Sequence, residues 1–138
     1  VTAKEDPDVA EVKEAEMEYQ TTESGLKYRI IEYGRGIQAE KGDIVRVHYS
    51  GKLTDGTIFD NSYERGEPIK FQLGIGRVIL GWDEGIALLH QGDKAEFIIP
   101  PDLGYGDRDL GTIPPNSTLI FEVELVEVIS EQKPAEGK

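Results

Sequence analysis

Residues 77–82 read Arg-Val-Ile-Leu-Gly-Trp, and this run contains the only tryptophan of a chain in which 30% of the residues are charged. Aliphatic residues in succession beside a large aromatic ring indicate a rigid apolar surface. By residue type alone, a tryptophan among aliphatic residues is most often part of a hydrophobic core. The run is therefore either core or the wall of an apolar binding site, and the rest of the chain has to decide between them.

The run leads into a short amphipathic segment. Trp82, Ile86 and Leu89 recur at spacings of four and three residues, which is the period of one helical face. Two acidic residues follow the tryptophan directly, in the first turn, where they complement the helix dipole. We therefore expect one short helix over 82–89, and a helix of this length covers only one face of a sheet.

Most of the remaining chain has a period of two, which is typical of half-buried strands. Apolar residues alternate with polar ones over 45–49 and over 119–125. Three further segments, 28–32, 69–73 and 94–99, bring the expected number of antiparallel strands to about five. The predicted fold class is α+β, with a twisted antiparallel sheet wrapped around the short helix.

Two turn-like segments interrupt this pattern. Asp55-Gly56 separates two strand-like runs and predicts a hairpin, because glycine readily adopts a positive φ. Pro100-Pro101 ends a strand, and residues 102–115, with three glycines and two prolines, predict a loop. A loop of this length in a compact domain is usually functional or disordered.

The composition limits the possible functions. A chain of 138 residues fits one domain. Its 27 acidic and 15 basic side chains give a net charge of −12, which argues against nucleic acid as a partner, since phosphate backbones need clustered Lys and Arg. The absence of cysteine excludes disulfides, thiol catalysis and thiolate metal sites.

The two ends of the chain differ from its middle. Residues 1–22 are acidic with scattered apolar residues, so we expect a largely flexible arm, and residues 131–138 predict a flexible tail. Residues 23–130 then form the folded domain. No apolar run approaches the 18 or so residues of a membrane span, so we expect no membrane partner.

A conventional catalytic or cofactor site is not recognisable in the sequence. His48 and His90 lie in unrelated contexts, and neither has a partner spaced for a metal site or a catalytic triad. Gly74-Ile75-Gly76 lacks the rest of a dinucleotide-binding fingerprint. We therefore expect no metal and no cofactor. The aromatic residues left in turn-like or exposed contexts favour a binding cleft, and they are Tyr49, Phe59 and Tyr105.

Five motifs resemble those of one protein family, in the same order and spacing. They are Val47-His48-Tyr49-Ser50-Gly51, Asp55-Gly56-Thr57-Ile58-Phe59-Asp60-Asn61-Ser62, Val78-Ile79-Leu80-Gly81-Trp82-Asp83-Glu84-Gly85, Gly104-Tyr105-Gly106, and residues 113–121. The family is that of the FKBPs, the tacrolimus-binding immunophilins, which are peptidyl-prolyl cis-trans isomerases. The resemblance covers about 24–129 and implies an FKBP-like fold, an antiparallel five- to six-stranded half-barrel sheet around one short α-helix.

The resemblance also implies an apolar pocket. The catalytic residues would be Tyr49, Phe59, Asp60, Ile79, Trp82 and Tyr105, and the substrate-binding residues Val78, Ile69, Ile113, Phe121 and Leu110. In the family, the backbone N–H at the position of Ile79 and the hydroxyl at that of Tyr105 each bind a ligand carbonyl, and the acid matching Asp60 joins a polar network. By residue type alone, Val78 and Phe121 also fit plain core, and Asp60 a turn cap. Leu80 has no role in the pocket and is expected to pack under the sheet.

Two positions depart from the family pattern. Ile69 stands where many members have an aromatic residue, so one wall should be less aromatic and macrolide affinity lower. The loop after Tyr105 lacks a Pro-Gly pair that some relatives carry and is one residue shorter. This departure leaves open whether Leu110 or Ile113 lines the pocket.

The implied activity needs no acid, base or metal. Isomerisation of an X-Pro bond breaks no covalent bond, and an apolar pocket favours the twisted, less polarised amide of the transition state. We therefore predict a peptidyl-prolyl cis-trans isomerase that assists protein folding. It would act as a monomer on proline-containing polypeptides and bind macrolide inhibitors of the tacrolimus and rapamycin type. The alternatives are a non-catalytic module that binds proline motifs and a folding chaperone.

The segment before the first predicted strand bears on the compartment. Residues 22–28, Thr-Glu-Ser-Gly-Leu-Lys-Tyr, resemble the lead-in of exported bacterial and plastid-lumen family members. This similarity favours an extracytoplasmic location, in the periplasm or the thylakoid lumen, over the cytoplasm.

Overall fold

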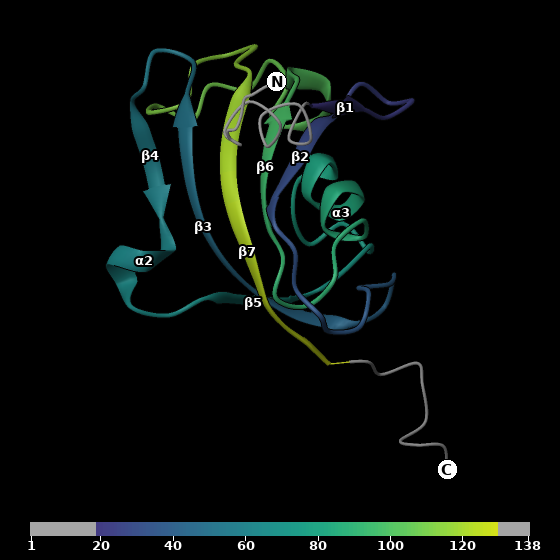
Figure 1. Ribbon diagram of the computed structural model, residues 1–138. Helices are drawn as coiled ribbons and strands as arrows, with labels where there is room; N and C mark the ends of the chain where they lie inside the picture. Colours follow the sequence, from purple (N-terminus) through teal and green to yellow (C-terminus); the bar gives the residue numbers. More distant parts are fainter. Residues whose placement is uncertain (1–18, 130–138) are drawn as a thin grey trace, which may run out of the picture.

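The computed structural model describes residues 19–129, which form an antiparallel sheet that curves around a short helix (Figure 1). The strands are β1 (Gln20–Thr21), β2 (Lys27–Glu32), β3 (Ile44–Leu53), β4 (Ile58–Asn61), β5 (Ile69–Gln72), β6 (Lys94–Ile99) and β7 (Leu119–Ile129). The helices are α2 (Ser62–Arg65), α3 (Leu80–Ile86) and the 3-10 helix η1 (Pro101–Leu103). The predicted α+β fold is confirmed, with a seventh strand, β1, in addition.

Strand β3 organises the sheet, whose strand order is β1-β2-β6-β7-β3-β4. One edge of β3 pairs with β7 along its whole length. The other edge pairs with β5 over residues 44–47 and with β4 over residues 50–52. Between β4 and β5 the chain leaves the sheet and forms α2 (Figure 1). Because β4 and β5 pair with the same edge of β3, residues of both strands line one cavity, which is described below.

Helix α3 lies against the concave face of the sheet (Figure 1). Two glycines allow it to approach β6 closely, because a Cβ at Gly81 would lie 2.8 Å from Ile99 and a Cβ at Gly85 would lie 2.7 Å from Phe97. Such distances are too short for ordinary side chains. The fully buried side chains around this contact include Ile86, Leu89, Phe97, Ile99, Leu119, Leu125, Val45 and Val47.

The predicted bounds of this helix, 82–89, are wrong at both ends. The helix begins at Leu80 and ends at Ile86, because the N–H groups of Leu88 and Leu89 bond three residues back and close a tight turn instead. Leu80 is 58% exposed and does not pack under the sheet as expected. The face of α3 that meets β6 is taken by Gly81 and Gly85, which leaves Leu80 toward solvent.

The single helical turn α2 was not predicted, although both of its ends carry cap residues. The Asn61 side chain accepts a hydrogen bond from the Tyr63 N–H at 2.9 Å, and Gly66 ends the turn with a φ of +82°. Between these caps, Ser62 is fully buried against β3. The turn therefore joins the core through a serine, which an apolar pattern does not reveal.

The predicted turns are confirmed. Gly56 has a φ of +94°, and its N–H donates to the Leu53 carbonyl at 2.9 Å in the hairpin between β3 and β4. The loop after β6 opens with η1, whose Leu103 is buried, and has no helix or strand from residue 104 to 118. This long loop reaches the cavity described below.

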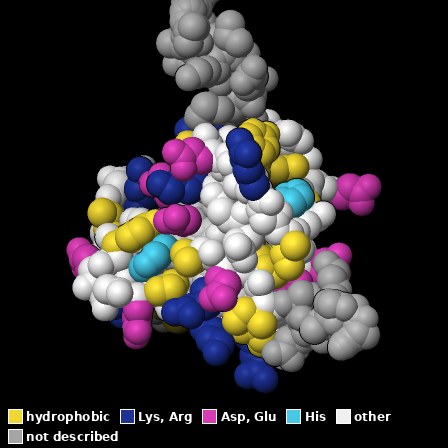
Figure 2. Space-filling model, turned by 60° about the horizontal axis from the view of Figure 1, so that its bottom comes forward, with side chains coloured by type: hydrophobic (Ala, Val, Ile, Leu, Met, Phe, Trp, Pro, Cys, Tyr) yellow, Lys and Arg dark blue, Asp and Glu magenta, His cyan; other side chains and the backbone are white. Residues whose placement is uncertain are grey.

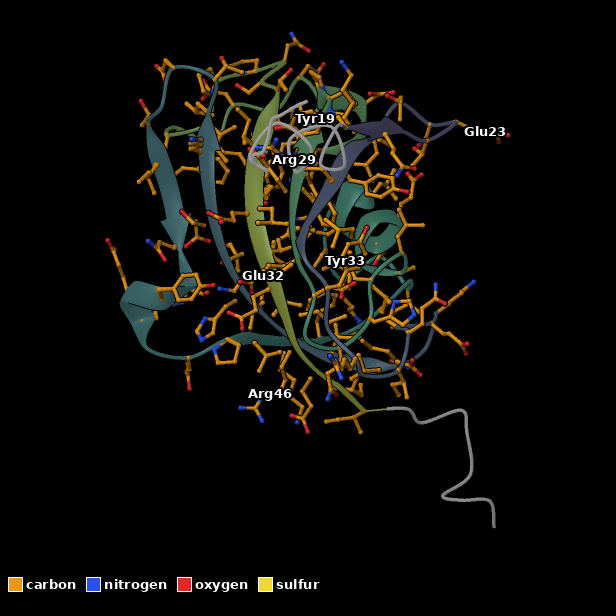
Figure 3. The ribbon with its side chains drawn as sticks, in the orientation of Figure 1. Tyr19, Glu23, Arg29, Glu32, Tyr33 and Arg46 are labelled. Carbon is orange, nitrogen blue, oxygen red and sulfur yellow. The ribbon has the colours of Figure 1, made fainter. Side chains whose placement is uncertain are left out.

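The first strand belongs to the segment that we predicted as a flexible arm. Gln20 pairs with Tyr28 of β2. Next to it, the Tyr19 hydroxyl donates to Glu96 at 2.7 Å and the Arg29 guanidinium lies 4.7 Å from the Tyr19 ring centroid (Figure 3). Residues 1–18 of the arm and the predicted tail 131–138 lie outside the described residues, and the domain limits 23–130 stay a prediction.

The surface is mixed in charge. Figure 2 shows acidic and basic side chains interspersed on one face, with apolar side chains in small patches and both histidines visible. None of the helices within residues 19–129 is long and apolar enough to cross a membrane.

Candidate functional site

A cavity of about 440 Å³ opens between the sheet, the start of α3 and the long loop after η1. Every residue that the sequence predicted for the site lines this cavity: Tyr49, Phe59, Asp60, Ile69, Val78, Ile79, Trp82, Tyr105, Leu110, Ile113 and Phe121. Arg77 and Thr112 complete the lining and were not predicted. Residues that lie up to 72 positions apart in the sequence therefore meet at one site.

The floor of the cavity is Trp82, which is 4% exposed. Its ring meets Tyr49 of β3 edge-on at 4.9 Å between centroids and Phe121 of β7 edge-on at 5.3 Å. Phe71 of β5 packs at 5.9 Å. Edge-to-face arrangements of this kind are favourable for aromatic pairs and fix the orientation of the rings. The tryptophan of the opening run is thus both core and cavity lining.

One wall of the cavity is possible only because position 51 is a glycine. Phe59 and Phe121 pack edge-on at 5.5 Å. A Cβ at Gly51 would lie 2.6 Å from the Phe121 ring and 2.7 Å from the Phe59 ring. Glycine at position 51 therefore makes room for both rings. Phe121 is 4% exposed, so its role as core and its place in the wall coexist.

The segment 73–79, which carries Val78 and Ile79, is held by a carboxylate of α3. Asp83 accepts hydrogen bonds from the N–H groups of Gly74 at 2.8 Å and Gly76 at 3.0 Å. Ile79 is the N-cap residue of α3 in an extended conformation, and its N–H donates to no group among residues 19–129. A backbone donor next to the cavity is therefore available to a ligand.

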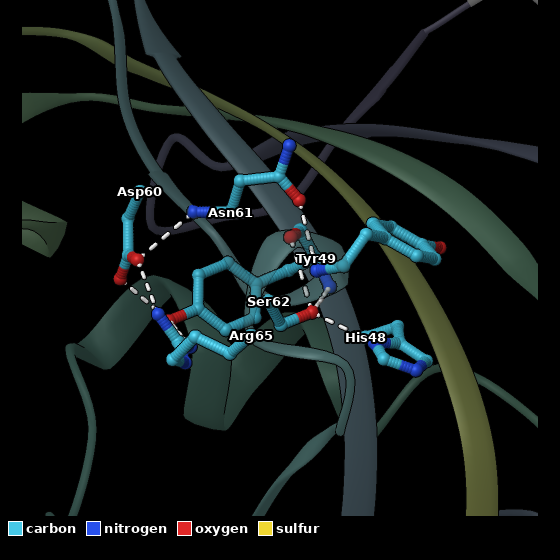
Figure 4. A network of polar contacts seen from close by, with 7 residues as sticks. His48, Tyr49, Asp60, Asn61, Ser62 and Arg65 are labelled. Atoms are coloured by element: carbon cyan, nitrogen blue, oxygen red, sulfur yellow. Dashed lines mark hydrogen bonds and ion pairs between the residues drawn. The ribbon is translucent and has the colours of Figure 1, made fainter.

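A polar network forms the rim beside β4 (Figure 4). The Tyr49 hydroxyl donates to Asp60 Oδ2 at 2.5 Å, Arg65 Nη1 donates to Asp60 Oδ1 at 2.7 Å, and Arg65 Nη2 donates to the Tyr49 hydroxyl at 2.8 Å. Arg65 was not predicted, because it comes from α2. Asp60 is thus bonded to both of its neighbours in the rim rather than acting as a turn cap alone.

This network fixes the charge states of the rim. Burial acts to raise the pKa of Asp60, but the hydrogen bonds from Tyr49 and Arg65 outweigh burial and lower that pKa below its ordinary value. Burial, together with the hydrogen bond to Asp60, raises the pKa of the Tyr49 hydroxyl. Asp60 is therefore ionised and Tyr49 is neutral near pH 7.

Behind the rim, Ser62 supports the backbone of Tyr49. The Tyr49 N–H donates to Ser62 Oγ at 2.7 Å, and Ser62 Oγ lies 2.8 Å from His48 Nδ1 (Figure 4). The His48 ring stacks on Tyr63, with centroids 4.4 Å apart. Burial, with the nearby Glu124 carboxylate, raises the pKa of Tyr63 to about 12. His48 thus lies on the outer face of β3, as its place in the alternation indicated.

The opposite side of the cavity is formed by the long loop. Tyr105 is partly buried, and burial together with the negative charge of Asp60 raises the pKa of its hydroxyl. Within residues 19–129 this hydroxyl has no hydrogen-bond partner. Both Leu110 and Ile113 line the cavity, and they differ in burial: Ile113 is 7% exposed and Leu110 is 43% exposed.

The arrangement is suited to binding an apolar group that carries carbonyls. Aromatic rings form the floor and one wall, while Ile79 N–H and the Tyr105 hydroxyl are unpaired donors at the edge. Cavities of a few hundred Å³ with few polar groups are typical of small-ligand sites. Among residues 19–129, no group of three or more His, Asp or Glu side chains is placed to hold a metal ion.

Comparison with known proteins gives a consistent result. Residues 36–126 match the family model of the FKBP-type peptidyl-prolyl cis-trans isomerases. A protein of Haemophilus influenzae named "Probable FKBP-type peptidyl-prolyl cis-trans isomerase" is 52% identical over 109 residues, which are 78% of this chain and 44% of that protein. The "FK506-binding protein 2" of Debaryomyces hansenii is 52% identical over 97 residues, 70% of this chain and 72% of that protein.

A solved structure agrees with the fold. The crystal structure of FkpA from Escherichia coli superimposes with a TM-score of 0.77 at 43% sequence identity, covering 90% of this chain and 59% of that one. The chain thus spans less than half of the Haemophilus protein and about three fifths of the Escherichia chain. The family model, the relatives and the fold point the same way, and this chain belongs to the FKBP-type peptidyl-prolyl cis-trans isomerase family.

Proposed function

We propose that this chain catalyses the cis-trans isomerisation of X-Pro bonds in polypeptides and so assists protein folding. The family model and the relatives named as isomerases support this activity. The observation that carries the proposal is the cavity itself, an aromatic pocket with the Ile79 N–H and the Tyr105 hydroxyl as unpaired donors at its edge. Such a site matches a proline ring flanked by carbonyl groups.

In the proposed complex, the proline ring lies on Trp82, between Tyr49 and the wall formed by Phe59 and Phe121. Ile79 N–H and the Tyr105 hydroxyl hold carbonyl oxygens on either side of the ring. The network of Asp60 and Arg65 keeps Tyr49 in place through its hydroxyl group. This arrangement leaves the X-Pro bond inside the pocket, shielded from water.

Catalysis then follows from differential binding of the twisted amide. The barrier to rotation about a peptide bond is about 18–20 kcal/mol, because resonance places charge on the carbonyl oxygen. An apolar pocket removes the water that stabilises this charge separation in the planar ground state, so the less polarised, twisted amide is favoured. A 10⁴-fold acceleration needs about 5.5 kcal/mol of such differential stabilisation. Desolvation plus one or two hydrogen bonds made best to the twisted form would supply it.

The same cavity is the proposed site for macrolides of the tacrolimus and rapamycin type. Ile69 lies in its lining, where a larger aromatic side chain would add contact area. We therefore propose weaker macrolide binding than in relatives with an aromatic residue there. We also propose that the chain acts as a monomer.

The test is magnetisation-exchange NMR on an Ala-Leu-Pro-Phe peptide, with and without the protein. Acceleration of the cis-trans exchange is expected, and Phe59→Ala and Asp60→Val should lower kcat/KM at least tenfold with an unchanged circular dichroism spectrum. Ile58→Ala is the matched control on β4, because Ile58 is 58% exposed and does not line the cavity. Absence of acceleration by the unaltered chain contradicts the proposal, and peptide binding without acceleration would instead support the non-catalytic module.

A further inference from the structure

The cavity lining contains two charged side chains among the described residues, Asp60 and Arg77. The negative charge of Asp60 already has a partner, because Asp60 accepts hydrogen bonds from both Tyr49 and Arg65 and forms an ion pair with Arg65 at 2.7 Å. Its negative charge is therefore largely compensated by the neighbouring guanidinium. The uncompensated charge of the cavity comes from Arg77.

Arg77 lacks the carboxylate partner that three of the other arginines have. Arg29, Arg46 and Arg65 each form an ion pair with a carboxylate. Arg77 is exposed and forms no ion pair or side-chain hydrogen bond within residues 19–129. Arg77 is therefore a cation in the cavity lining that has no carboxylate partner among the described residues. Its five N–H donors are available to a ligand.

The backbone around Arg77 is anchored. The Gly76 N–H donates to Asp83 of α3, and Val78 on the other side lines the cavity. The next residue, Ile79, carries the unpaired N–H that is proposed to hold a carbonyl next to the proline. Arg77 is thus two residues from the group that positions the substrate backbone, within reach of side chains adjacent to the proline.

Arg108 is a second arginine near the cavity, and its position differs from that of Arg77. Arg108 lies in the opposite loop, where its charge acts on the Tyr105 hydroxyl, but its side chain does not line the cavity. Arg77 is therefore the cation that belongs to the cavity lining itself.

We propose that Arg77 is a specificity-determining residue that selects polypeptides with a Glu or Asp directly before or after the proline. The inference rests on the proposed isomerase function and specifies its substrates. A guanidinium and a carboxylate can pair through two parallel N–H···O bonds. The net negative charge of the chain repels acidic peptides at long range, but charges beyond about 8 Å are screened at physiological ionic strength, so the local pair prevails.

The test compares matched peptides by exchange NMR on the full chain. One pair is Ala-Glu-Pro-Phe and Ala-Gln-Pro-Phe, and the other is Ala-Leu-Pro-Glu-Ala and Ala-Leu-Pro-Gln-Ala. For at least one pair, kcat/KM should be roughly two- to fivefold higher for the Glu peptide, the range expected for an exposed ion pair of up to about 1 kcal/mol. The preference should fall as NaCl is raised to 0.5 M, because exposed pairs are screened by salt.

Three variants distinguish an effect of the Arg77 side chain from an effect of the net charge of the chain. In Arg77→Gln, the ratio of kcat/KM for the Glu peptide to kcat/KM for the Gln peptide should fall to one. In Arg77→Lys, part of the preference for the Glu peptide should remain. Arg35→Gln is the matched control, since it removes the same charge from an exposed arginine away from the cavity, and its ratio should equal that of the unaltered chain. No Glu preference in either pair, or a preference that survives in Arg77→Gln, overturns the inference. A chain that accelerates none of the four peptides contradicts the proposed function instead.

Discussion

The two sides of the cavity are fixed in different ways. On one side, which we call the carboxylate-held side, Asp60 bonds to Tyr49 and Arg65, and Asp83 bonds to two N–H groups of segment 73–79. On the other, the backbone-held side, residues 104–118 are joined mainly by their own main chain, for example Leu110 N–H to the Ile113 carbonyl at 3.0 Å. Charged hydrogen bonds from regular elements hold the Ile79 donor and the rim, whereas the loop that carries Tyr105 depends on local bonds and buried apolar area.

The largest expected effect concerns the buried anchor of the backbone-held side. Ile113→Ala removes most of a side chain that is 7% exposed, so we expect a loss of about 2–4 kcal/mol in the free energy of unfolding. Urea unfolding followed by tryptophan fluorescence measures the change. A loss below about 1 kcal/mol would show that the loop is held by its backbone bonds alone.

The next effect tests the carboxylate-held side. Asp83→Ala leaves the Gly74 and Gly76 N–H groups without their acceptor, and each hydrogen bond to a charged group contributes about 1.5–3 kcal/mol. Partial exposure reduces the total, so we expect about 1.5–3 kcal/mol of lost stability and a lower kcat/KM, because segment 73–79 carries the proposed Ile79 donor. Glu84→Gln removes one charge from the same helical turn and is the control. Equal effects of the two variants would contradict an anchoring role for Asp83.

Acid should weaken the carboxylate-held side selectively. The pKa of Asp60 is lowered in the folded chain, so its stabilisation is fully present above the ordinary aspartate pKa of about 3.9. It is lost as the pH falls through the lowered value. We expect a flat profile of peptide binding from pH 8 to 5 and a decline below about pH 4. In Asp60→Asn this decline should be absent, as measured by Trp82 fluorescence titration with a proline peptide.

The smallest effect concerns the exposed residue of the loop. Leu110→Ala changes a side chain that is 43% exposed, so the free energy of unfolding should change by less than about 0.5 kcal/mol. Because Leu110 lines the cavity, KM for a Leu-Pro peptide should rise by roughly two- to threefold, as expected for partial loss of an apolar contact. A destabilisation as large as that of Ile113→Ala would show that both residues anchor the loop.

The fold was predictable where the hydrophobic period was regular. The alternation in β3 and β7 and the turn at Gly56 predicted their elements, and the motifs around Trp82 and Tyr105 predicted the cavity lining. The bounds of α3 were not predictable from periodicity, since Leu89 continues the helical spacing but belongs to a turn.

The site residues that the sequence did not predict were missed because their positions depend on tertiary contacts and not on a hydrophobic period. Arg65 acts from α2, and its partner Asp60 lies five positions away, a link that only the cap residues Asn61 and Gly66 could have indicated. Arg77 and Thr112 line the cavity from loops, whose course depends on tertiary bonds that leave no periodic signal. Ser62 is buried for its hydroxyl group, and polar burial is not visible in an apolar pattern.

The contact between α3 and β6 has a consequence for anyone who redesigns or transplants this cavity. The height of Trp82 above the sheet is determined by Gly81 and Gly85, neither of which lines the cavity. A design that copied only the lining residues would permit alanine at both positions, and each added methyl group would lift the helix off Ile99 and Phe97. The position of Trp82, the floor of the cavity, would then change. A design of this cavity must therefore keep glycine at positions 81 and 85 as well as the lining residues, because the absence of their side chains sets the position of the helix.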